Sequence, residues 1–202
     1  MSTMNTINGL PLPLVPVGRE SLLGIRLGMS YAQVLPALQA LVAFGFEAPP
    51  VVSDDTGFLT LHMRDAAGVL NGAIRLELGG DAEADKEVVR AGLTVIGEPF
   101  SDSQSAGQRL DEMKAWTQAA AGAPTLALDM GDEWTRSGAH FDTDVAAYSA
   151  IWAHGSTMKG VHTPQMFSSL VKDAAGPVVI GHISAVEEGG VFRVATTLAL
   201  RD

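Results

Sequence analysis

Residues able to carry out catalysis gather in the second half of the chain. Ser156 precedes Lys159 by three residues, the spacing of a nucleophilic serine one helical turn from a lysine that takes its proton. The Ser-Asp-Asn and Lys-Thr-Gly elements that complete such an active site are missing from the sequence. We therefore interpret the pair as a chance match and keep a small hydrolase using Ser156 and Lys159 as an alternative.

Histidines are the other candidates, because neutral imidazoles can bind metals. His154 and His162 flank the serine–lysine pair at a spacing that fits no standard ligand pattern, and no His-Glu-x-x-His element is present. We interpret them, with His140 and His182, as ordinary strand or loop residues, and a histidine-centred hydrolytic site stays an alternative. The chain has no cysteine and no glycine-rich phosphate loop. We therefore predict no metal and no cofactor.

Acidic residues gather in two stretches. The first, at 81–87, is typical of a solvated face. The second belongs to strands and turns of the second half and consists of Asp129, Asp132, Glu133, Asp142 and Asp144. A solvated hairpin end is the simpler interpretation of this second group. The functional interpretation is a negative patch that receives a basic protein partner, and these five are our predicted partner-binding residues.

Composition narrows the classes of partner. The chain has 202 residues, 47% of them hydrophobic, and a formal net charge of −10. This acidity argues against nucleic acid and against an anionic membrane surface, since both need a basic footprint. No stretch is long and apolar enough to span a bilayer, and prolines interrupt the apolar N-terminal run. We expect no secretory signal and a cytoplasmic location, and we leave the oligomeric state open.

The first half contains an arm, a helix and a hairpin. The prolines of residues 1–20 favour an extended arm. A capping box, Ser30 to Gln33, predicts a helix that Pro36 kinks or shortens. Alternating residues predict strands at 58–63 and 73–78, with Arg75 and Glu77 on a polar face. Residues 66–72 supply turn residues between them, and Asn71-Gly72 is the strongest part of that signal. Residues 81–97 fit either a short helix or a strand.

The second half is predicted to be mostly strand. A helix at 102–121, with serines offering its cap, precedes three strands. A short helix at 163–175 then has Thr163 as cap and Pro164 at its first position. The predicted strands are 125–130, 133–141, 146–153, and the hairpin 177–186 with 191–200. In the last strand, Arg193 and Arg201 lie on the outer face.

This order of elements predicts an α+β fold. The sheet is mostly antiparallel, with two main helices and a short third one, because helices and strands do not alternate one for one. We expect an extended N-terminal arm at 1–20 and a single domain at 21–202. A helix followed by strands occurs twice, which suggests two similar helix–sheet halves, 21–100 and 101–202.

The helix opening carries a family resemblance. Residues 24–34, Gly-Ile-Arg-Leu-Gly-Met-Ser-Tyr-Ala-Gln-Val, resemble the helix start of the outer-membrane assembly lipoprotein and β-lactamase-inhibitor-like group. They also resemble the start of several immunity proteins that accompany secreted bacterial toxins. The stretches at 121–124, 133–134 and 148–152 are similar to the second half of such immunity proteins. The printed sequence has no cysteine to lipidate and we expect no signal sequence, which departs from the lipoprotein branch.

The resemblance implies protein binding rather than catalysis. We therefore expect a non-enzymatic module, an immunity-type or chaperone-like partner of a bacterial toxin or effector. The resemblance identifies no contact residue. A further alternative is a structural component of a secretion system or phage that assembles through its proline-rich arm.

Overall fold

The computed structural model describes residues 6–7, 10–11, 21–50, 57–64, 67–80, 86–97, 99–129, 144–153, 158–160 and 163–202. Within the predicted arm, two short strands, β1 (Thr6–Ile7) and β2 (Leu10–Pro11), pair antiparallel. The rest of the arm and the predicted strand at 133–141 lie outside the described residues.

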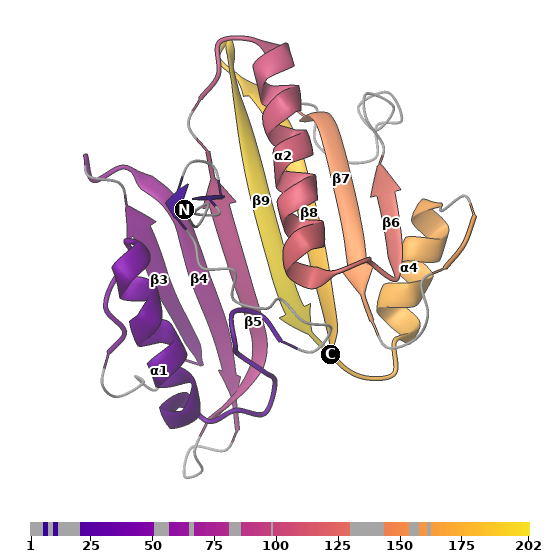
Figure 1. The fold of residues 1–202 in the computed structure, drawn as a ribbon. Helices are drawn as coiled ribbons and strands as arrows, with labels where there is room; N and C mark the ends of the chain where they lie inside the picture. The colour runs from indigo at the N-terminus through magenta and orange to yellow at the C-terminus, as the bar shows by residue number, and fades with distance from the viewer. Residues whose placement is uncertain are drawn as a thin grey trace.

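One antiparallel sheet organises the described part of the chain (Figure 1). Its seven strands have the order β3-β4-β5-β9-β8-β7-β6, and every neighbouring pair is antiparallel. The strands are β3 (Phe58–Arg64), β4 (Leu70–Gly79), β5 (Glu87–Ile96), β6 (Leu126–Asp129), β7 (Asp144–Trp152), β8 (Val178–Glu188) and β9 (Val191–Arg201). The predicted α+β class with a mostly antiparallel sheet is confirmed.

The pairing of β5 with β9 joins the two halves of the chain. Leu61, Ile74, Leu93 and Leu198 lie opposite one another on four successive strands, and all four are buried. They share one face of the sheet because directly paired residues point to the same side. Residues 21–100 and 101–202 therefore contribute to a single sheet and a common core.

Each helix begins at a local signal. At α1 (Tyr31–Leu41), Oε1 of Gln33 accepts a hydrogen bond from the Ser30 amide at 2.9 Å, so the predicted capping box is present. The helix continues past Pro36 to Leu41, and a short 3-10 turn, η1 (Val42–Phe44), follows.

The two later helices are also capped by side chains. At α2 (Ser103–Ala121) the cap is Asp102 rather than one of the predicted serines, and its carboxylate accepts from the Ser105 amide at 2.7 Å. That hydrogen bond lowers the pKa of Asp102 from its ordinary value. At α4 (Pro164–Asp173) the cap is Thr163, as predicted.

The helices cover the two faces of the sheet unequally. Figure 1 shows α1 and α2 on the same face, over the β3 side and over β9 and β8 respectively. The short helix α4 packs against Ile151 and Ile180. Ile151 alternates with Ala150 and Trp152 of the main core, so α4 lies on the opposite face, at the β6 end of the sheet.

In the first half, the structure decides one open alternative and corrects one expectation. Residues from Glu87 onward form β5 and not a helix, because their side chains alternate between the core and the opposite face. The predicted Asn71-Gly72 turn is wrong, since both residues belong to β4. The left-handed φ of +80° at Gly68 marks the loop between β3 and β4, within the predicted turn stretch 66–72 but before its Asn71-Gly72 part.

Gly72 is a glycine for a packing reason and not for a turn. A Cβ atom at this position would lie 2.5 Å from the carbonyl oxygen of Thr94 on β5 and 3.0 Å from Cε of Met63 on β3. The close approach of the neighbouring backbone explains why the dipeptide, which favours a turn in isolation, sits inside a strand.

Candidate functional site

The predicted acidic patch is described only in part. Asp129 ends β6 and Asp144 begins β7, and because these strands pair antiparallel both residues belong to the same end of the sheet. Asp132, Glu133 and Asp142 lie outside the described residues. The patch as a partner-binding surface therefore stays a prediction.

Asp129 already has a basic partner within the chain. Nζ of Lys114, on α2, lies 2.7 Å from the Asp129 carboxylate and 3.3 Å from that of Asp111. Burial alone would lower the pKa of Lys114, but the two carboxylates outweigh it and raise the pKa above the ordinary 10.5. Sequence spacing gives no sign of this contact, because Lys114 precedes Asp129 by fifteen residues.

Replacing Lys114 by methionine should lower the free energy of unfolding by about 1 kcal/mol at neutral pH. The ion pair is only partly buried, since the side chain of Asp129 is 58% exposed. The raised pKa means that the stabilisation is fully present below pH 10.5 and is lost as the pH rises through the folded-state pKa above that value. Urea titrations of wild type and variant over this range measure the difference.

Lys172 provides the control, because it is an exposed lysine of α4. Lys172→Met removes the same charge and should change stability by only a few tenths of a kcal/mol. Equal losses in the two variants would show that Lys114 contributes through overall charge and not through its two carboxylates.

Lys159 lies within the described residues and Ser156 outside them, so the serine–lysine pair stays a prediction. His140, His154 and His162 also lie outside the described residues. The remaining second-half histidine, His182 of β8, is described. Its Nδ1 lies 2.8 Å from Oγ of Ser149 on β7.

A large part of the sheet is open on the face opposite α1 and α2. Among the described residues no helix covers β3, β4, β5 and β9 on this side, since α4 packs at the other end (Figure 1). Paired residues form rows across these four strands. They are Phe58, Glu77, Arg90 and Arg201 in the first row, Thr60, Arg75, Gly92 and Ala199 in the second, and His62, Ala73, Thr94 and Thr197 in the third.

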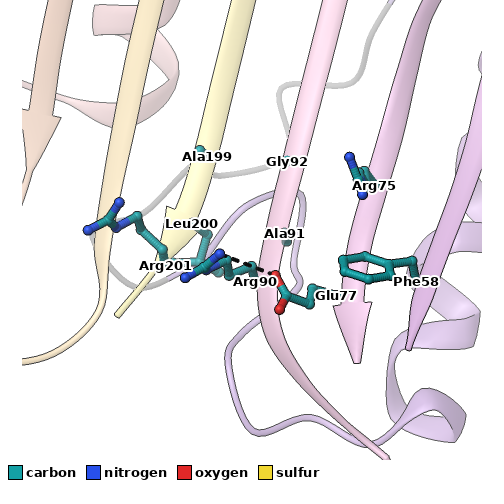
Figure 2. Close-up of a pocket in the computed structure, with 9 residues that line it drawn as sticks. All are labelled: Phe58, Arg75, Glu77, Arg90, Ala91, Gly92, Ala199, Leu200 and Arg201. Atoms are coloured by element: carbon teal, nitrogen blue, oxygen red, sulfur yellow. Dashed lines mark hydrogen bonds and ion pairs between the residues drawn. The ribbon is translucent and has the colours of Figure 1, made fainter. Parts of the chain in front are cut away.

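A groove of about 460 Å³, in the size range of ligand sites, is lined by the whole first row and by Arg75, Gly92 and Ala199 of the second. Gly92 and Ala199 form its floor, where they leave the backbone of β5 and β9 uncovered. Figure 2 shows Arg75 and Phe58 on one side, and Glu77, Arg90 and Arg201 along one end. We call this the arginine groove and define it by Arg75, Arg90 and Arg201.

The charges of the arginine groove are unbalanced. Nη1 of Arg90 lies 3.4 Å from the Glu77 carboxylate, whereas no carboxylate among the described residues forms an ion pair with Arg75 or Arg201. The guanidinium of Arg75 lies 4.8 Å from the centre of the Phe58 ring. Nε of Arg201 is buried and has no hydrogen-bond partner in the described part of the chain.

A second groove adjoins the first and has the opposite character. Its volume is about 430 Å³, it shares Glu77 and Arg90 with the arginine groove, and it adds Glu87 and Asp202. The open face therefore presents a cationic groove next to an acidic one.

Strand alternation predicts that Arg75 and Arg201 lie away from the core, and this is the only sequence signal for the arginine groove. The three arginines lie on β4, β5 and β9, and the pairing of β5 with β9 brings them together. Nothing local in the sequence indicates that pairing.

The described residues contain neither a metal-binding cluster nor a helix that could span a membrane. Within them, no group of three or more histidine, aspartate or glutamate side chains could hold a metal ion. No described helix has both the length and the hydropathy needed to cross a bilayer. Comparison with protein-family models, curated proteins and solved structures gives no match to this chain.

Proposed function

We propose that the protein is a non-enzymatic binding module, an immunity-type or chaperone-like partner of a bacterial toxin or effector. The open face of the sheet carries this proposal. Antiparallel sheets commonly have one solvated face, and long charged side chains are then expected on it. Here the middle of the face instead carries short side chains, at Ala73, Gly92 and Ala199, next to a cluster of arginines.

Short side chains make this surface suitable for a partner. They leave the backbone of the sheet accessible and cost little conformational entropy when a partner covers them. Arginines are enriched in protein interfaces, where their planar groups stack and form paired hydrogen bonds. The toxin or effector as partner is supported by the resemblance of residues 24–34 to the helix start of immunity proteins.

Co-expression with the products of the flanking genes tests the proposal. A toxin–immunity pair should form a complex that survives size-exclusion chromatography, with a mass measured by light scattering. Expression of the flanking product alone should arrest growth of the host, and co-expression of this chain should relieve that arrest. The proposed function is contradicted if no flanking product forms a complex with the chain and co-expression protects the host from none of them.

The hydrogen bond between Ser149 and His182 favours a second candidate, a histidine-centred hydrolase. A serine hydroxyl bonded to an imidazole is the arrangement that activates a serine nucleophile. The same contact also occurs as an ordinary pair between neighbouring strands, and Ser149 is only 7% exposed.

Labelling with a fluorophosphonate probe separates these two interpretations. Under the binding proposal we expect no covalent labelling of the wild-type protein, because the buried hydroxyl of Ser149 is out of reach of the probe. Labelling of wild type that disappears in Ser149→Ala, detected by intact-mass spectrometry, would support the hydrolase instead. Ser184→Ala, a neighbouring buried serine of β8, is the matched control.

A further inference from the structure

We propose that the arginine groove binds an acidic peptide segment of a partner protein through its carboxylates. The inference rests on the proposed function and names the chemistry of the partner's contact. It assigns a different role from that of the predicted acidic residues near Asp129, which would receive a basic partner.

The first argument is local charge. The whole chain carries −10, from 23 acidic and 13 basic residues, yet three of those basic residues gather around one groove. Arg90 and Arg201 lie directly opposite each other on β5 and β9, and like charges in that position destabilise a sheet. Among the described residues, Glu77 forms an ion pair only with Arg90. A carboxylate from outside would offset the remaining repulsion.

The second argument is the glycine of the floor. A Cβ atom at Gly92 would meet only the Leu198 carbonyl oxygen, at 3.8 Å, so the fold leaves room for a side chain there. Packing requires glycine at Gly72 but not at this position. Because Gly92 has no side chain, the floor of the groove stays open.

The third argument is preorganisation at the rim. Phe58 is 52% exposed and lies against the guanidinium of Arg75. This stacking holds the guanidinium in place before any ligand arrives, which lowers the entropic cost of binding. The ring also offers an apolar surface to a peptide side chain next to the carboxylate.

Charge complementarity favours a short acidic segment over nucleic acid. A long polyanion would be repelled by the overall charge of −10 and by Glu87 and Asp202 in the acidic second groove. A peptide can place its carboxylates over the arginines and neutral or basic residues over that second groove.

Fluorescence anisotropy with a fluorescein-labelled polyglutamate peptide tests the proposal at low ionic strength. We expect saturable binding that weakens as salt is added. Arg75→Ala and Arg201→Ala should each raise the dissociation constant about tenfold or more, as for the loss of a charge-assisted hydrogen bond. Gly92→Val should abolish binding by filling the floor, and circular dichroism should confirm that each variant is folded.

Arg193→Ala is the matched control. Arg193 lies on the same strand and face as Arg201 but at the other end of β9, and it is exposed. This substitution removes the same charge and should change the dissociation constant by about twofold or less. An equal loss with Arg193→Ala would overturn the proposal, because binding would then follow overall charge.

The remaining outcomes also decide the question. No polyglutamate binding at low salt would overturn the proposal, as would binding of citrate or inorganic phosphate without the peptide. Self-association that Arg201→Ala abolishes, measured by light scattering, would identify a second copy of the chain as the occupant and overturn it too. A negative result in the polyglutamate experiment does not change the outcome of the co-expression experiment, so each proposal can be overturned without the other.

Discussion

Replacing Trp152 by alanine should lower the free energy of unfolding by about 3–5 kcal/mol, the largest effect we expect from any single substitution. The Trp152 side chain is fully buried on β7. Its ring lies over Gly181 of β8, where an added Cβ atom would be 3.0 Å from the indole carbon Cζ3. The cavity left by alanine would be bordered by strands that cannot close it. Urea unfolding followed by far-ultraviolet circular dichroism measures the loss.

Trp152 also connects the sheet to the end of α2. Its Nε1 donates to the carbonyl oxygen of Gly122 at 3.0 Å, just after the last residue of the helix. Trp152→Phe keeps most of the ring but leaves that carbonyl without its donor, which should cost about 1–3 kcal/mol.

Trp116 on α2 is the matched control for this hydrogen bond. Its Nε1 is buried and has no partner among the described residues. Trp116→Phe therefore removes an unpaired donor along with part of the ring, and the net change should stay within about 1 kcal/mol. If Trp116→Phe costs as much as Trp152→Phe, the Gly122 hydrogen bond does not contribute as proposed.

Replacing Gly72 by alanine should destabilise the protein by about 1–3 kcal/mol through overpacking. The nearest atom to the new Cβ would be the Thr94 carbonyl oxygen, which belongs to the backbone of β5 and cannot rotate away. Either the β4–β5 ladder opens locally or the strands shift apart. Thermal and urea unfolding of the variant measure the cost.

Gly92→Ala separates this steric effect from the general effect of replacing a strand glycine. Gly92 lies on the neighbouring strand, and its added Cβ would make only an ordinary contact. Alanine restricts the unfolded chain more than glycine, so this variant should be as stable as wild type or about 0.4–1 kcal/mol more stable. Destabilisation of both variants by the same amount would contradict the steric explanation.

The sequence alone determines the features whose causes are local. Ser30 and Gln33 predict the start of α1 because a capping box needs only residues within one turn. Thr163 and Pro164 do the same for α4. Alternation predicts which residues of the last strand face the core, since successive side chains of a strand point to opposite sides.

Local signals failed where another strand intervenes. Asn71-Gly72 favours a turn by its own conformational preferences, but the approach of Thr94 from β5 places it inside a strand. Residues 81–97 were ambiguous because a short apolar pattern fits two periods, and only the pairing of β5 with β4 and β9 decides for a strand from Glu87 onward.

The candidate sites depend on the tertiary structure more than any other feature. Alternation places Arg75 and Arg201 away from the core. Backbone hydrogen bonds are the same for every pair of strands, so they do not specify that β9 lies beside β5. That pairing is decided by the burial of whole faces, such as Leu93 against Leu198, and it brings the arginines to one groove. The sequence therefore determined the elements whose signals are local and the faces of their strands, while the order of the strands decided which charges meet.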